Sequence, residues 1–173
     1  MSRILTLGEI QDDYARGICE HIENPGYFST LTFPRSFWKP CPGRKNKQYS
    51  EFVIGLKLVR QTVGRLYVLV NDQCAGKPTR PKNRNLRIAT IIEGLKSKSH
   101  IHMVTEDHHK LNKMILRGIL LQASPFTSPK AIKVKHIYDL QGLGEYLVKE
   151  VNPDALTIRI ELFGPQKQGG KHD

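Results

Sequence analysis

Two histidines separated by a single residue, His100 and His102, lie in an otherwise apolar segment that ends at Val104. Side chains at positions i and i+2 of an extended strand project from the same face and lie about 7 Å apart. Neutral imidazole is a good ligand for divalent metal ions, so the spacing predicts that both rings could close on one ion. On its own, a His-x-His pair is more often two polar residues on the solvated face of an ordinary strand.

A carboxylate precedes the two histidines. Glu93 ends a strand-like segment that begins at Leu86, and the six residues from Gly94 to Ser99 are predicted to form a loop. Glu93 and His100 would then lie opposite each other where a hairpin closes, and directly opposed residues of antiparallel strands share a face. The sequence therefore predicts two imidazoles and one carboxylate on one sheet face, with coordination positions left open for substrate or water.

A predicted helix from about residue 138 to residue 151 carries a second pair of reactive side chains, Tyr146 and Lys149. At about 100° per residue, the leucines and valines of this segment form one apolar arc, and Tyr146 and Lys149 fall together on the opposite side. A free phenol has a pKa near 10, and a neighbouring ammonium group would favour the phenolate. Tyr146 is therefore a candidate nucleophile. The alternatives are Tyr138 as the nucleophile and a solvated Tyr146–Lys149 surface pair.

The motif His100-Ile101-His102 followed by Tyr146-x-x-Lys149 resembles the HUH endonucleases, the family of rolling-circle replication initiators and relaxases. The tyrosine–lysine spacing is similar to that of initiators from circoviruses and other small single-stranded DNA replicons. The spacing from Glu93 to the first histidine is similar to the metal site of parvovirus initiators. The early segment FSTLTFP, residues 28–34, loosely matches a third family element, and the motifs occur in the family's order.

The resemblance implies a ferredoxin-like or RRM-like sheet with the two histidines on a central strand. It also implies that His100, His102 and Glu93 bind a divalent ion, Mn²⁺ or Mg²⁺, which polarises a DNA phosphate. Tyr146 would attack the phosphodiester and leave a covalent 5′-phosphotyrosine, with Lys149 beside the phenol.

The activity implied is metal-dependent, sequence-specific nicking and joining of single-stranded DNA at an origin or stem-loop, initiating rolling-circle replication or a related strand transfer. The position four residues beyond Tyr146 is Glu150 rather than a second tyrosine, which implies a single-tyrosine mechanism. The chain has no Gly-x-x-x-x-Gly-Lys-Ser/Thr phosphate loop. A separate helicase and a host polymerase are therefore the expected protein partners.

Positive charge dominates the composition of the chain. There are 27 Lys and Arg against 16 Asp and Glu, a formal net charge of +11, and the pI is near 9.7. Such an excess favours a polyanionic partner, nucleic acid first and an anionic membrane surface second. Two polar segments are candidates for DNA contact. Their candidate residues are Arg35, Trp38, Arg44 and Lys45 in the first, and Lys77, Arg80, Lys82 and Arg84 in the second. The alternatives are a packing role for Trp38 and a merely solvated second loop.

The 173 residues are expected to form one α+β domain over residues 1–163, with a helical extension over residues 1–25 and a disordered tail over residues 164–173. A central antiparallel sheet with helices covering one face is expected. Periodicity predicts helices near residues 4–23, 47–63, 106–122 and 138–151, and strands near 27–33, 65–70, 86–93, 98–105, 131–136 and 156–163. No segment is apolar enough for a membrane span or a signal peptide, which favours an intracellular protein without membrane contact, cytoplasmic in a prokaryotic host or nuclear for a eukaryotic virus.

Two other functions fit the same sequence. A non-catalytic nucleic-acid-binding module of RRM-like fold would use the positive charge and the rings of Tyr27, Phe28 and Phe33 as stacking platforms. A metal-dependent nuclease that activates water would keep the two histidines and Glu93 but would not need a tyrosine nucleophile.

Overall fold

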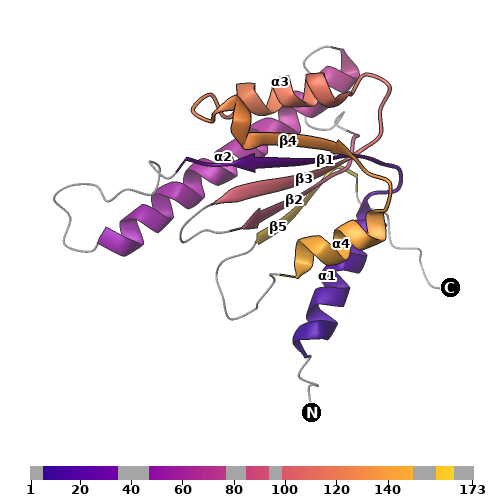
Figure 1. Ribbon diagram of the computed structural model, residues 1–173, viewed down its shortest axis with the longest axis horizontal. Coiled ribbons are helices and arrows are strands. Elements are labelled where there is room, and N and C mark those ends of the chain that lie inside the picture. Colours follow the sequence, from indigo (N-terminus) through magenta and orange to yellow (C-terminus); the bar gives the residue numbers. More distant parts are fainter. Residues whose placement is uncertain (1–5, 35–46, 77–84, 94–98, 150–158, 166–173) are drawn as a thin grey trace.

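The structure, a computed structural model, describes residues 6–34, 47–76, 85–93, 99–149 and 159–165. Its centre is a five-stranded sheet in the order β4-β1-β3-β2-β5, in which every neighbouring pair is antiparallel. The strands are β1 (Pro25–Thr32), β2 (Ile88–Glu93), β3 (His100–Glu106), β4 (Ile132–His136) and β5 (Arg159–Phe163). The predicted α+β class is confirmed, and the strand that carries both histidines, β3, lies in the middle of the sheet (Figure 1).

Helices cover both faces of the sheet, not one as predicted. They are α1 (Leu7–His21), α2 (Lys47–Ala75), α3 (Lys113–Ala123) and α4 (Leu140–Val148). One core cluster joins α2 and α3 to one face of the sheet, and a second cluster joins α1 and α4 to the other. The reason lies in β2, which is buried on both faces: Ile88 and Ile92 face the first cluster, whereas Ala89 and Ile91 face the second. A strand with an unbroken apolar sequence needs cover on both sides.

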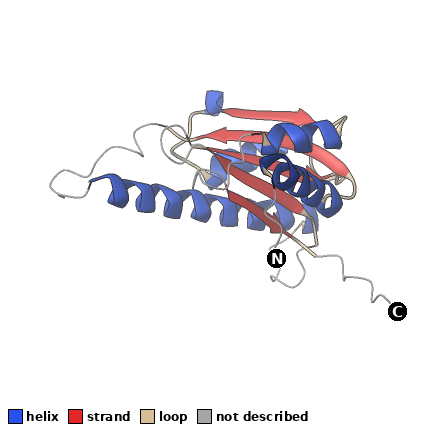
Figure 2. Ribbon diagram, turned by 90° about the horizontal axis from the view of Figure 1, so that it is seen from below, coloured by secondary structure: helices blue, strands red, loops and turns tan. Residues whose placement is uncertain are grey.

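Helix α2 is continuous over 29 residues, so the strand predicted over residues 65–70 is wrong. Val59, Val63, Leu66 and Val70 recur at steps of four, three and four and are all buried in the α2–α3 core. That period is helical, although a short run rich in valine and leucine is also typical of a strand. The helix ends at Gly76, whose φ of 73° is the left-handed conformation common after a helix C-terminus. Figure 2 shows α2 reaching well past the sheet.

Helix α3 begins seven residues later than predicted. Strand β3 continues to Glu106, whose backbone N–H donates to the Arg87 carbonyl oxygen at 3.2 Å and whose carboxylate accepts a hydrogen bond of 3.0 Å from the Arg87 N–H. Asn112 is the actual N-cap, and its side chain accepts a hydrogen bond of 2.9 Å from the Ile115 N–H. An Asn side chain satisfies such an unpaired helical N–H well.

Candidate functional site

The β2–β3 hairpin brings together the three predicted metal ligands. Glu93 is directly opposite His100 in the register of this pair, as the sequence predicts, and His102 is opposite Ile91. All three side chains lie on the α1–α4 side of the sheet, because Ile91 belongs to the core cluster on that side.

Glu93 lies close to both histidines. Its Oε2 lies 2.8 Å from His100 Nε2 and 3.3 Å from His102 Nε2. One ligand atom from each of the three residues falls within 4.8 Å of the others, so the group could hold a metal ion. The side chains of His102 and Glu93 are 7% and 13% exposed, and that of His100 is 29% exposed. The site is thus partly buried and opens at His100.

The Glu93 carboxyl is ionised at neutral pH. Burial by itself raises its pKa, but hydrogen bonds from His100 and His102 and the charge of those rings outweigh the burial and lower the pKa to about 2. Metal ligands must be deprotonated to bind. The carboxylate therefore needs no proton removed before it can coordinate an ion.

Two residues of the neighbouring strand β1, Thr30 and Phe28, contact His102. The sequence analysis did not predict either contact. Thr30 is opposite His102 in the β1–β3 register, and its Oγ1 lies 3.1 Å from His102 Nδ1. The Phe28 ring stacks on the imidazole with 5.3 Å between centroids and 20° between planes. To bind a metal, His102 Nε2 would have to give up the proton that it shares with Glu93, and Nδ1–H would then donate to the Thr30 hydroxyl.

Helix α4 carries Tyr146 on the same side of the sheet as the three ligands. The two residues that follow it, Leu147 and Val148, are buried in the same cluster as Ile91. Tyr146 itself is 50% exposed, and Lys149 Nζ lies 4.1 Å from the centre of its ring. The predicted common face of Tyr146 and Lys149 is confirmed, with the ammonium over the ring face.

Close packing against α1 fixes the position of α4 (Figure 1). A Cβ at Gly144 would lie 3.3 Å from Cys19 Sγ and 3.4 Å from the Ala15 carbonyl oxygen, so glycine permits the close approach. At the far end, Gln11 Nε2 donates a hydrogen bond of 3.2 Å to the Lys149 carbonyl oxygen. The helix that presents Tyr146 is therefore held at both its middle and its end.

The candidate DNA-contact residues from the sequence cannot be compared with the structure. The eight predicted DNA-contact residues, Arg35, Trp38, Arg44, Lys45, Lys77, Arg80, Lys82 and Arg84, lie outside the described residues, as do Glu150 and the predicted tail from residue 166.

Two of the three rings proposed as stacking platforms face the α2–α3 side. Phe33 is 3% exposed and packs against Phe126, and Tyr27 packs edge-on against His136. Phe28 alone lies on the site's side, against His102. Phe33 is buried and cannot stack on a base in this structure.

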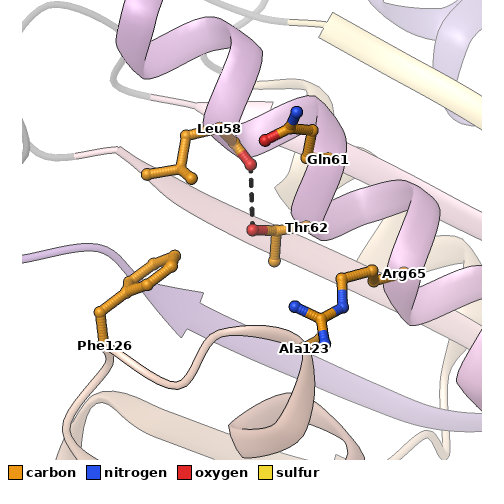
Figure 3. A pocket seen from close by; sticks show the side chains of 6 residues that line it. All are labelled: Leu58, Gln61, Thr62, Arg65, Ala123 and Phe126. Atoms are coloured by element: carbon orange, nitrogen blue, oxygen red, sulfur yellow. Dashed lines mark hydrogen bonds between the residues drawn. The ribbon is translucent and has the colours of Figure 1, made fainter.

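A pocket of about 300 Å³ lies apart from these residues, between α2 and the end of α3 (Figure 3). Leu58, Thr62 and Arg65 from α2 line it together with Phe126, and the Thr62 hydroxyl donates a hydrogen bond of 3.0 Å to the Leu58 carbonyl. Phe126 packs in the core cluster on the α2–α3 side. The pocket therefore belongs to the face opposite Glu93 and the histidines.

Comparisons with known proteins add little. No family model matches the sequence, and no curated protein matches it. A solved structure described as the crystal structure of a hydrolase from Listeria innocua is similar with a TM-score of 0.32 and 7% identity, covering 70% of this chain and 64% of that chain. This chain thus spans less than two thirds of that structure, and a likeness at this level supports no conclusion about activity. Among the described helices, none has the length and apolarity required to cross a bilayer.

Proposed function

We propose that this protein is a metal-dependent, single-tyrosine endonuclease of the HUH type, which nicks and rejoins single-stranded DNA. One observation carries the proposal: three clustered donors of Glu93, His100 and His102 lie on the sheet face that the Tyr146 helix also covers. Metal ligands and a nucleophile on one face are what phosphodiester cleavage through a covalent enzyme intermediate requires.

The donor set fits a hard or borderline divalent ion. Two imidazole nitrogens and one ionised carboxylate suit Mn²⁺ well, and Mg²⁺ is the abundant alternative. An ion bound by these residues would supply Lewis-acid polarisation of a phosphate oxygen. Glu93 supplies the negative charge of the set, and Thr30 holds the His102 ring in the orientation that binds.

Tyr146 performs the bond exchange in this proposal. Its phenol oxygen forms a bond to phosphorus, the bond from phosphorus to the 3′ oxygen breaks, and the phenol proton is released as the departing 3′ oxygen takes one up. The product keeps one phosphodiester bond to the enzyme, so a free 3′-hydroxyl can reverse the step without ATP. Lys149, whose ammonium lies over the Tyr146 ring, would contribute positive charge beside the reacting phosphate.

Initiation of rolling-circle replication, or a related strand transfer in a small replicon, is the role we infer from the motif resemblance. The net charge of +11 suits a nucleic acid substrate. The origin or stem-loop would be presented as single-stranded DNA by a separate helicase and copied by a host polymerase.

The test uses a random-sequence pool of single-stranded oligonucleotides labelled at the 3′ end, incubated with the protein and Mn²⁺. We expect label to migrate with the denatured protein, because the 5′-phosphate of the downstream fragment is joined to Tyr146. Tyr146→Phe removes only the phenol oxygen and should abolish the adduct, whereas Tyr138→Phe is the matched control and should keep it. Sequencing the captured DNA gives the nick site.

Three outcomes contradict the proposal. Cleavage without an adduct, retained in Tyr146→Phe, indicates a nuclease that activates water. Binding with neither cleavage nor adduct indicates a non-catalytic module. An adduct lost in Tyr138→Phe but kept in Tyr146→Phe moves the nucleophile to Tyr138, a residue that is 92% exposed.

A further inference from the structure

Strand β4 forms one edge of the sheet and presents two lysines on the side of the metal ligands. Its residues alternate: Ile132 and Val134 pack into the α2–α3 core, whereas Lys133 and Lys135 point to the opposite side and are exposed. Neither lysine pairs with a carboxylate among the described residues.

The register places these lysines in line with the candidate metal site. Lys133 is opposite Thr30, and Thr30 is opposite His102. In the next row, Lys135 is opposite Phe28, whose ring stacks on His102. At about 4.8 Å per strand, the Lys133 backbone lies about 10 Å from that of His102. A four-carbon side chain spans much of that distance.

The core of α1 and α4 covers part of this face. It includes Ala89 and Ile91 of β2 and Val104 of β3, and Phe28 of β1 packs against it. On β1, Thr30 and Thr32 remain partly exposed. A strip of hydroxyl and aromatic side chains therefore runs from His102 to two lysines without a carboxylate partner in the described part of the chain.

We propose that Lys133 and Lys135 bind the phosphates adjacent to the scissile phosphodiester and so position the single strand over the ligands. This inference rests on the proposed function and adds a substrate-binding surface to it. The two lysines are about 7 Å apart along β4, which lets them engage neighbouring phosphates of an extended strand. Ammonium groups contact phosphates without reading bases, so the surface sets position and affinity, not sequence preference.

Edge-strand lysines also have a plainer role, since positive charge at an edge discourages pairing with another sheet. The two roles predict different losses. Edge protection predicts self-association when the lysines are removed, with DNA affinity retained. Phosphate binding predicts a weaker, less salt-dependent complex from a protein that stays in its original oligomeric state.

The experiment compares two double variants with equal loss of charge. Lys133→Gln/Lys135→Gln removes the proposed contacts, and Lys57→Gln/Lys113→Gln removes two exposed lysines of α2 and α3, on the other side of the sheet. Each is made with Tyr146→Phe for binding, measured by fluorescence anisotropy with a labelled random-sequence single strand from 0.05 to 0.5 M salt. A single-strand contact contributes about 0.7 to the log–log slope, so the slope should fall by about 1.4 and affinity at 0.1 M salt by about 25-fold.

The control double variant should keep the wild-type slope, and Lys133→Arg/Lys135→Arg should restore most of the affinity. In the nicking assay with Tyr146 intact, KM should rise while kcat changes little, because the contacts act on binding. An unchanged slope in Lys133→Gln/Lys135→Gln, an equal loss in the control, or self-association with normal affinity overturns the inference. If the wild type forms no adduct yet the slope still falls, the proposed function fails while the binding surface stands.

Discussion

Loss of the Thr30 hydroxyl should weaken metal binding at a site that Thr30 does not itself coordinate. Thr30→Val keeps the branched shape of the side chain but removes the oxygen that lies 3.1 Å from His102 Nδ1. His102 is only 7% exposed, so water cannot readily replace that partner. The Nδ1 atom then loses its hydrogen bond, and the ring loses a contact that holds its orientation.

The size of the effect follows from this geometry. Removing the hydrogen-bond partner of a metal-binding histidine typically costs about 10- to 100-fold in metal affinity, which corresponds to about 1.4–2.7 kcal/mol. The stacked Phe28 ring still restrains the plane of the imidazole. We therefore expect a loss near the lower end, about tenfold.

Calorimetric titration of Mn²⁺ into the purified protein measures this loss directly. Thr30→Ser keeps a hydroxyl and should stay within a few-fold of the wild type. Thr32→Val is the matched control, because Thr32 lies on the same face of the same strand, opposite His100. Thermal unfolding in EDTA checks that all three variants fold alike. Wild-type Mn²⁺ affinity in Thr30→Val, or an equal loss in Thr32→Val, would refute the reasoning.

Three further predictions concern single side chains. The pKa of Glu93 is lowered to about 2 from an ordinary 4.5. The ionised carboxylate therefore stabilises the fold above pH 4.5 by at most about 3 kcal/mol, and this stabilisation is lost as the pH falls towards 2. Glu93→Gln should therefore flatten the acid limb of the unfolding free energy measured by urea titration in EDTA, and the exposed Glu145→Gln should not. Asn112→Ala should cost about 1 kcal/mol of unfolding free energy by loss of the α3 N-cap, and a smaller loss in Asn112→Ser would identify the cap as the cause. Lys149→Ala should slow adduct formation several-fold without abolishing it, because its ammonium lies beside the Tyr146 ring and contributes charge but forms no bond to the phosphate; an unchanged rate places Lys149 outside the chemistry.

The grouping of the candidate metal ligands could be predicted from the sequence because it depends on local rules. A period of two placed His100 and His102 on one face, and the length of the connecting segment placed Glu93 opposite His100. The shared face of Tyr146 and Lys149 likewise followed from helical periodicity.

The surroundings of the ligands could not be predicted, because they depend on which strands become neighbours. Thr30 meets His102 only because β1 pairs with β3, and Lys133 joins their row only because β4 pairs with β1. These pairings join segments far apart in the sequence, and no local pattern encodes them. The strand predicted at residues 65–70 is wrong for the opposite reason. Its local pattern fits both a strand and a helix, and only the packing of α2 between Val59 and Val70 against the sheet decides.

An ion bound at the end of the β2–β3 hairpin would link the two strands. Glu93 on β2 and the two histidines on β3 belong to adjacent strands, so an ion held by all three joins those strands at the end where their pairing begins. Such an ion binds the folded chain in preference to the unfolded one, which raises the unfolding free energy by about 2.7 kcal/mol when its concentration is 100 times its Kd. Under the proposed function, metal supply would then affect the stability of the folded hairpin as well as cleavage.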